Sequence, residues 1–322
     1  MRTRLTEMLG IEHPVMLAGM GGVSYHRVVA AVSEAGGFGT LGAATMSSQQ
    51  LDDEMLGVRK LTNKPFGVDL LAALPERMVD DAHKVVEGGA SLFVAGLGVP
   101  RDVIKVLHGG NVLVASMCGK VRHAIAAVEA GCDFVIAQGT EAGGHTGTVA
   151  TMPLVPQIVD AVGARAPVVA AGGIFDGRGL AAAIALGADG VWLGTRFIAT
   201  PEARTVTGYK DALLRAHEDD TVISRGFTGK TLRALRNEWT QHIEEHPEEL
   251  SKFPEQMGKA VAANALHLGG DENTPVDPDK ECYPSGQGVG AVNALVPAGD
   301  LVRQIVDEAE HALARAARTV VR

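Results

Sequence analysis

The chain alternates short apolar runs with longer segments in which apolar residues recur at helical spacing. Apolar runs of four to six residues rich in β-branched side chains are typical of buried strands. Helices are predicted between them, at His26–Glu34, Glu76–Val86, Val121–Glu129 and Arg178–Leu186. The alternation indicates the repeated strand–helix units of a parallel α/β protein. Eight strands are predicted, at Val15–Ala18, Gly39–Ala43, Phe66–Leu71, Leu92–Ala95, Val112–Ser116, Phe134–Ala137, Pro167–Ala171 and Val191–Gly194.

Glycine marks the junctions in this pattern. The segments EAGGFGTL, EGGASLFV, EAGCDFVI and LGADGVWL each place glycine after a helix and before a strand, where a left-handed helix cap is expected. Eight such units match a (β/α)8 TIM barrel, a fold of roughly 250 residues. A doubly wound sheet is the alternative, but Gly19, Gly21 and Gly22 lack the G-x-G-x-x-G spacing of its dinucleotide loop. We therefore expect a barrel.

The pattern changes after Thr200. The stretch TLRALRNEWTQHIEEHPEEL has the character of a polar helix, and GGDENTPVDPDKECYP that of a loop. Helical spacing returns over Asp300–Val320, which would pack back as the last barrel helix. We expect residues 1–205 and 285–322 to form the barrel, and residues 206–284 to form a helical insertion that covers the substrate site.

Composition excludes several classes of protein. The 322 residues include 40 glycines and carry a net charge of −9, which offers no basic surface for nucleic acid. Cys118, Cys132 and Cys282 form no CxxC pair, which argues against a disulfide framework or a zinc site and fits a reducing cytoplasm. No apolar signal region or stretch of about 18 apolar residues occurs, so we expect neither export nor a membrane anchor.

Two glycine-rich loops are candidates for binding phosphate. In a TIM barrel the active site lies at the C-terminal ends of the strands, and the loops after strands seven and eight commonly hold a phosphate. Here these loops read AAGGIFDGRG and GTR, and both offer free backbone N–H groups at a helix start. The alternative is that the glycines only turn strand into helix. A phosphate with a ring above the barrel mouth suggests flavin mononucleotide (FMN).

The loop after the sixth strand, QGTEAGGHTG, holds the best acid–base candidate. His145 is flanked by Gly143, Gly144 and Gly147, so its loop can approach a ligand closely. An imidazole can take a proton from an acidic C–H or donate a hydrogen bond to an oxyanion. The alternative is a purely structural hydrogen bond. The other ten histidines lack this setting, and we expect them to be structural or exposed.

Other strand ends contribute weaker candidates. Met20 and Met117 either line an apolar cofactor face or fill the core. Asp69 follows Gly67 and Val68 in the third strand, and Cys118 has no histidine spaced to activate it as a nucleophile. No HExxH or paired-carboxylate pattern appears, so we expect no metal.

The motifs HPVMLAGM, FGVDLL, QGTEAGGHTG, AAGGIFDGRG and LGTRF resemble those of the nitronate monooxygenase family, formerly called 2-nitropropane dioxygenases. The resemblance runs over nearly the whole chain and includes SGQGVG at Ser285–Gly290. It implies an FMN-containing (β/α)8 barrel with a smaller helical domain. An FMN-dependent enoyl-acyl-carrier-protein reductase and NADH:quinone reductases share these motifs, which are therefore specific for fold and flavin but not for substrate.

The resemblance also implies roles for individual residues, with His145 as the catalytic histidine. Three positions depart from the family, since Asp69 stands where Asn is frequent, Met117 where some members have Lys, and Gln138 where some have an acidic residue. A missing lysine and an ionised Asp69 would weaken electrostatic support for the flavin. The residues expected against FMN are Gly19, Met20, Gly21, Asp69, Met117, Gln138 and Gly143, with the phosphate at Ala171, Gly172, Gly173, Gly194 and Thr195.

Three functions follow from these observations. The first is a flavin enzyme that oxidises alkyl nitronates with O2, in which His145 binds the nitro oxygens or removes the α-proton. The second is an NAD(P)H-dependent flavin reductase that acts on a quinone or an enoyl thioester. The third is a flavin-binding scaffold without activity. In each case the expected partners are small molecules, with neither nucleic acid nor membrane, and a homo-oligomer is left open.

Overall fold

The structure is a computed structural model that describes residues 1–71, 75–96 and 98–320. Eight parallel strands follow one another in the order β1-β9-β8-β6-β5-β4-β3-β2. A bridge between Met16 and Phe38 joins the two ends of this order, where the Phe38 N–H donates to the Val15 carbonyl over 2.9 Å. The predicted TIM barrel is confirmed. Its strands are β1 (Val15–Leu17), β2 (Gly39–Gly42), β3 (Phe66–Leu71), β4 (Leu92–Gly96), β5 (Leu113–Cys118), β6 (Phe134–Gln138), β8 (Val168–Ala171) and β9 (Gly190–Leu193).

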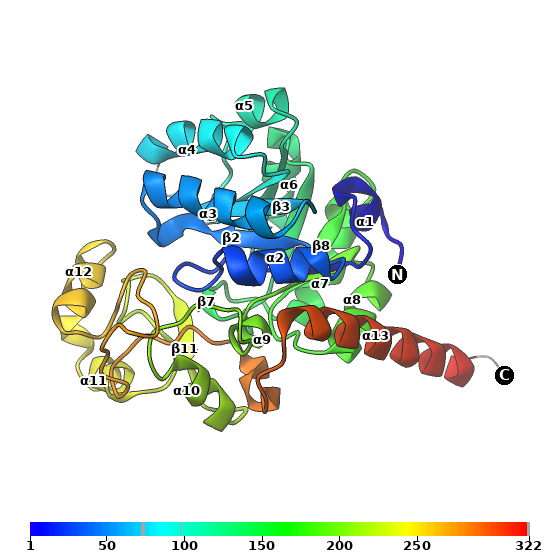
Figure 1. The fold of residues 1–322 in the computed structure, drawn as a ribbon. Coiled ribbons are helices and arrows are strands. Elements are labelled where there is room, and N and C mark those ends of the chain that lie inside the picture. Colours follow the sequence, from blue (N-terminus) through cyan, green and yellow to red (C-terminus); the bar gives the residue numbers. More distant parts are fainter. Residues whose placement is uncertain (72–74, 97, 321–322) are drawn as a thin grey trace.

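Helices surround the barrel, and the C-terminal helix α13 crosses back to pack on α8 and α2 (Figure 1). Its return as a barrel helix is therefore as predicted. The helices of the barrel are α1 (Arg4–Leu9), α2 (His26–Glu34), α3 (Ser48–Leu61), α4 (Pro75–Glu87), α5 (Ile104–Gly109), α6 (Val121–Ala130), α7 (Thr151–Val162), α8 (Gly177–Ala185), α9 (Thr195–Ile198) and α13 (Ala298–Val320), with short 3-10 turns η1 (Ala43–Thr45) and η3 (Gln287–Ala291).

Glycine ends the helices where the sequence pattern places it. Gly131 caps α6 with φ +105°, and its N–H donates to the carbonyl of Val128 at 3.1 Å. A side chain is strained in this left-handed conformation, so glycine is the residue that stops the helix and starts β6. Three further junction glycines, Gly36, Gly89 and Gly187, also have positive φ.

The barrel interior is filled rather than hollow. Met16, Phe38, Phe134 and Trp192 are buried inside it. Helix α1 closes the end of the barrel opposite the site, and its Leu5 is fully buried in the same cluster. Burying a leucine side chain contributes about 1.5–3 kcal/mol. One end of the barrel is thus sealed, and the other end is left for the site.

The insertion is not only helical. The polar helix predicted over residues 231–250 was wrong in its first part, because Leu232–Leu235 forms strand β11. This strand pairs antiparallel with β10 (Thr221–Ser224) and with β7 (Gly144–His145), a two-residue strand in the loop after β6. Its residues are buried, so packing and ladder hydrogen bonds override the helical character of the sequence. The helices of the insertion are α10 (Tyr209–Arg215), α11 (Glu238–Glu245) and α12 (Glu255–Ala262), with a 3-10 turn η2 (Pro247–Glu249).

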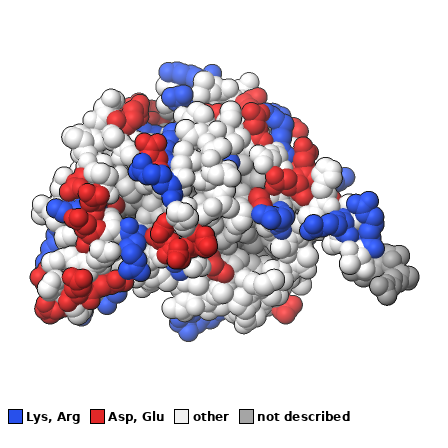
Figure 2. Space-filling model, turned by 90° about the horizontal axis from the view of Figure 1, so that it is seen from below, with Lys and Arg blue, Asp and Glu red and all other residues white. Residues whose placement is uncertain are grey.

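The surface carries mixed charge. On the face shown in Figure 2, basic and acidic side chains are interspersed. Within the described part of the chain, no helix has both the length and the apolar character to cross a membrane.

Candidate functional site

A cavity of about 1310 Å³ lies between the C-terminal ends of the barrel strands and the insertion. This is the end of a TIM barrel at which active sites are found. The structure brings all of the predicted site residues to this one cavity, although their roles remain predictions. They are Gly19, Met20, Gly21, Asp69, Met117, Gln138, Gly143, His145, Ala171, Gly172, Gly173, Gly194 and Thr195.

The loops after β8 and β9 form a cradle of backbone donors. Gly172 and Gly173 have φ +103° and +70°, so two successive residues are in the left-handed region. Among the described residues, no acceptor is found for the N–H groups of Gly172, Gly173 and Thr195. Successive free N–H groups in such a turn form an anion-binding concavity. The donor set therefore fits a phosphate.

The neighbouring carboxylate does not compete with an anion for this cradle. Both Glu141 carboxylate oxygens accept hydrogen bonds from Thr151, one of them also from its hydroxyl at 2.9 Å, so Glu141 caps helix α7. The Gly286 N–H donates to Thr195 Oγ1 over 2.9 Å and holds the SGQGVG segment against the cradle. A Cβ atom on Gly172 would lie 2.8 Å from Thr151 Oγ1. The cradle is built closely around glycine.

Asp69 lies beneath the loop that follows β1. A Cβ atom on Gly19 would come within 2.2 Å of Asp69 Cβ, so only glycine allows this contact. Burial raises the pKa of the Asp69 carboxyl well above its usual range. The neutral acid is then favoured, and it resembles the asparagine that is frequent at this position in the family. An uncharged Asp69 would not weaken the electrostatic support for the flavin as an ionised Asp69 would.

His145 is positioned by both the barrel and the insertion. It lies on β7, where it pairs with Leu232 of β11. Its carbonyl accepts a hydrogen bond from Gln138 Nε2 at 2.7 Å, which ties β7 to the end of β6. Its ring Nε2 lies 3.0 Å from Thr228 Oγ1 of the insertion. The imidazole is thus fixed by contacts on two sides of the cavity.

The surroundings of His145 favour its neutral form. Burial and the nearby Lys230 ammonium lower the pKa of His145 to about 4. The Lys230 side chain also lies over the Phe253 ring, with Nζ 4.4 Å from the ring centroid. At neutral pH the imidazole is therefore uncharged and is a weak base, and Lys230 is the cation that acts on it.

Basic side chains outside the predicted set of site residues also line the cavity. Met117 is half-buried against the barrel interior and supplies no charge. Lys120 and Arg196 line the cavity from the barrel, and Arg225 and Lys230 line it from the insertion. Position 117 therefore carries no lysine, but other basic side chains line the same cavity.

Two histidines that we expected to be structural or exposed, His123 and His267, line the cavity. His267 was missed because no strand ends near it, although the glycines of HLGG follow it directly. Thr228 and Lys230 were missed because the pairing of β11 with β7 is not visible in the sequence. The expectation that Cys118 is not a nucleophile is supported, since burial raises the pKa of its thiol to about 12.

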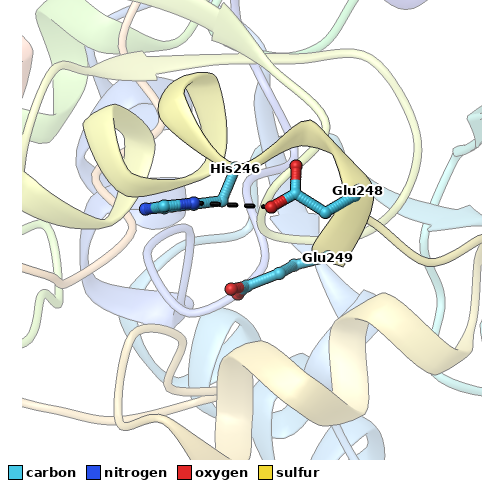
Figure 3. Close-up of side chains that lie close together, drawn as sticks. All are labelled: His246, Glu248 and Glu249. Atoms are coloured by element: carbon cyan, nitrogen blue, oxygen red, sulfur yellow. Dashed lines mark ion pairs between the residues drawn. The ribbon is translucent and has the colours of Figure 1, made fainter.

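A group of possible metal ligands lies outside the cavity, on the surface of the insertion. His246, Glu248 and Glu249 are exposed and lie close together (Figure 3). His246 Nδ1 lies 3.4 Å from Glu248 Oε1, and Glu249 Oε2 lies 2.9 Å from His242 Nε2. These ion pairs account for the arrangement, and we assign no metal to it.

Comparison with known proteins gives a consistent picture. The family model described as nitronate monooxygenase matches residues 2–91 and 81–308. The chain is 37% identical to "Putative monooxygenase Rv1533" of Mycobacterium tuberculosis, with 96% of each chain covered. It is 33% identical to a "Probable nitronate monooxygenase" of Staphylococcus aureus, with 85% of this chain and 90% of the relative covered.

Solved structures agree with these relatives. FabK from Thermotoga maritima has a TM-score of 0.89 and 33% identity, covering 99% of this chain and 100% of its own. A nitroalkane oxidase from Streptomyces ansochromogenes has a TM-score of 0.81 and 30% identity, covering 98% and 99%. Both likenesses span the barrel and the insertion. The chain belongs to the nitronate monooxygenase family and is a flavin-dependent oxidoreductase.

Proposed function

We propose that the protein is an FMN-dependent nitronate monooxygenase that oxidises alkyl nitronates with O2. The observation that carries this proposal is the pairing of a neutral His145 with the Lys230 cation at one cavity that also contains the donor cradle. A nitronate is an anion with two oxygens that accept hydrogen bonds. A neutral imidazole and an ammonium group are suited to hold it.

The residues present fit FMN. The N–H groups of Gly172, Gly173 and Thr195 would hold the phosphate, because they are free donors in a closely built turn. Gly19, Met20, Gly21 and Gly143 would lie against the ring, with Asp69, Met117, Gln138, Ala171 and Gly194 completing the contact. When bound, the flavin would accept electrons from the substrate and pass them to O2.

His145 would bind the nitro group rather than act as a strong acid. Its low pKa leaves it neutral at physiological pH, so it offers one N–H and one lone pair. The Lys230 ammonium would attract the anionic substrate. This assignment places substrate binding on the side of the cavity formed by β6, β7 and β11.

A second function is favoured by the size and charge of the cavity. A volume of about 1310 Å³ exceeds what a drug-sized ligand site of roughly 300–1,000 Å³ needs. Lys120 and Arg225 could contact the phosphates of NAD(P)H or of an acyl-carrier thioester. The alternative is therefore an NAD(P)H-dependent reductase of a quinone or enoyl thioester, with the insertion, residues 206–284, as the lid of the site.

Anaerobic mixing separates these functions. FMN-loaded protein is mixed without O2 with ethyl nitronate, NADH or NADPH, and flavin absorbance is followed. We expect bleaching by the nitronate and none by either nucleotide. Bleaching by NADH or NADPH alone would instead favour the reductase, and binding of FMN with no bleaching by any of them would favour a scaffold.

We further propose a cytoplasmic location, which suits the three buried thiols.

A further inference from the structure

One side chain of the insertion contacts the His145 ring, and the function proposed above gives it no role. Thr228 Oγ1 lies 3.0 Å from His145 Nε2. Thr228 is only 6% exposed, although it lines the cavity. Among the described residues, no hydrogen-bond partner is found for His145 Nδ1, and this atom is not fully buried. Nε2 therefore contacts the protein, and Nδ1 is the ring nitrogen left for a ligand in the cavity.

A short turn holds the Thr228 hydroxyl in place. The Lys230 N–H donates to Thr228 Oγ1 over 3.3 Å, and Gly229 between them has φ +80°. A threonine oxygen that accepts from the N–H two residues later forms a local turn of the Ser/Thr type. A Cβ atom on Gly229 would lie 2.4 Å from the Phe253 nitrogen, so the turn is packed closely against that segment. The position of the hydroxyl thus depends on the insertion and not on His145.

Two acceptors compete for the hydroxyl hydrogen of Thr228. The Lys230 carbonyl oxygen lies 3.4 Å from Thr228 Oγ1, whereas His145 Nε2 lies 3.0 Å from it. O–H···O hydrogen bonds span about 2.5–3.0 Å, so the carbonyl is too distant for a good bond. A hydrogen bond donated by Nε2 to Thr228 would leave the buried hydroxyl hydrogen without a good acceptor, which is costly. The hydroxyl therefore donates to His145 Nε2.

This hydrogen bond determines the tautomer of His145. A neutral imidazole carries one hydrogen, and the nitrogen that accepts a hydrogen bond cannot be the one that carries it. With Nε2 as the acceptor, Nδ1 carries the hydrogen and presents an N–H to the cavity. The backbone of His145 is held separately, by its pairing with Leu232 and by the hydrogen bond from Gln138 at 2.7 Å. Thr228 thus controls the ring hydrogen rather than the position of the strand.

We propose that Thr228 is a positioning residue that holds His145 as the Nδ1–H tautomer, so that Nδ1–H donates to a nitro oxygen of the bound nitronate. The opposite tautomer would present a lone pair to the same negatively charged oxygen and repel it. In this role His145 keeps its hydrogen, and no proton is transferred. The proposal rests on the proposed function, because the nitronate is the ligand that the N–H would hold.

Nitrogen NMR measures the tautomer without any substrate. The FMN-loaded protein is labelled with ¹⁵N-histidine, long-range ¹H–¹⁵N correlations are recorded at pH 7, and the His145 signals are those absent from His145→Gln. Wild type should show a protonated Nδ1 and an unprotonated Nε2. Thr228→Val keeps the branched shape but lacks the hydroxyl, so the Nε2–H tautomer should become the major form. Thr228→Ser should restore the wild-type tautomer.

Turnover of ethyl nitronate gives the second measurement. In Thr228→Val kcat/KM should fall about tenfold, as expected for loss of a hydrogen bond to a charged group, and Thr228→Ser should stay within about twofold of wild type. The control is Thr207→Val. The Thr207 hydroxyl donates to the Glu272 carbonyl over 2.7 Å on the exposed surface of the insertion. This variant should keep both the tautomer and the kcat/KM of wild type.

An Nε2–H tautomer in wild type, or an unchanged Nδ1–H tautomer in Thr228→Val, would overturn the proposal. A changed tautomer with wild-type kcat/KM would overturn the role of Nδ1–H in holding the nitronate. The wild-type spectrum alone is decisive if a variant fails to fold. If Thr228→Val changes the tautomer but wild type oxidises no nitronate, the proposed function fails, while the control of the His145 tautomer by Thr228 stands.

Discussion

Two histidines face the same cavity in opposite electrostatic surroundings. His145 lies beside Lys230, and burial together with this cation lowers its pKa to about 4. His267 lies in front of the buried carboxylate of Glu281, at 2.5 Å. The Lys230 cation disfavours the imidazolium form of His145, whereas the His267 ring lies against a carboxylate that accepts hydrogen bonds. The comparison teaches that residue type alone does not assign a role to an imidazole, because its neighbours differ from one side of the cavity to the other.

The two regions also differ in how they are built. His145 is held by a strand that pairs the barrel with the insertion, whereas His267 is held by one side chain of its own segment. A change at one histidine should therefore leave the other in place. This independence makes the comparison testable by single substitutions.

The largest effect is expected from His145→Gln. Loss of the imidazole that holds the nitro group should lower kcat/KM for ethyl nitronate by about 10–150-fold, the value of a hydrogen bond to a charged group. Steady-state turnover of ethyl nitronate by FMN-loaded protein gives this ratio. An unchanged kcat/KM in His145→Gln would contradict the role of His145 in holding the nitro group.

A substitution in the donor cradle tests how FMN is held. Gly172→Ala forces a side chain into φ +103° and within 2.8 Å of Thr151 Oγ1. A strain of about 1–3 kcal/mol corresponds to roughly 5–150-fold weaker FMN binding, measured by fluorescence titration. Nitronate oxidation should fall with flavin occupancy. The control is Gly258→Ala in α12, where an added Cβ meets nothing within 4 Å and FMN affinity should be unchanged.

Lys230→Met should make the surroundings of His145 more like those of His267. Loss of the cation raises the pKa of His145, and the acid limb of the kcat/KM profile for nitronate moves to higher pH. KM for the anionic nitronate should rise about 3–10-fold. Histidine NMR titration gives the pKa directly. A titration of His145 that stays near pH 4 in this variant would assign the shift to burial alone.

The last prediction concerns stability rather than activity. Because folding lowers the pKa of His145 from 6.5 to about 4, the unfolded chain binds the extra proton between these values. The free energy of unfolding of the apo protein should therefore fall by up to about 3 kcal/mol as pH drops from 6.5 to 4. His145→Gln should flatten this part of the urea-denaturation profile. An unchanged slope would contradict the lowered pKa.

Much of the fold follows from local pattern. The strands could be predicted because each is a short apolar run, and four of them follow a glycine that ends a helix, such as Gly131, whose positive φ is a local requirement. The cradle of Gly172 and Gly173 follows from strand order, since loops after consecutive barrel strands meet at one end. Local spacing was sufficient for both.

The insertion could not be predicted in the same way. Leu232–Leu235 has the composition of a helix and becomes a strand because β7 and β10 pair with it, from nearly 90 and from about ten residues away along the chain. Such pairing depends on the folded barrel. Lys230 and Thr228 therefore reach His145 only in three dimensions, and Glu281 meets His267 across a loop of 13 residues. The residues that set the electrostatics of the site were the ones that sequence pattern missed.

Oxygen uptake by FMN-loaded protein tests the central claim most directly. Ethyl nitronate is added in air-saturated buffer without NADH or NADPH, and O2 consumption is recorded at several nitronate concentrations. The account predicts saturable uptake with wild type whose kcat/KM is reduced at least about tenfold in His145→Gln. It would be contradicted by no uptake with nitronate together with rapid uptake on addition of NADH or NADPH.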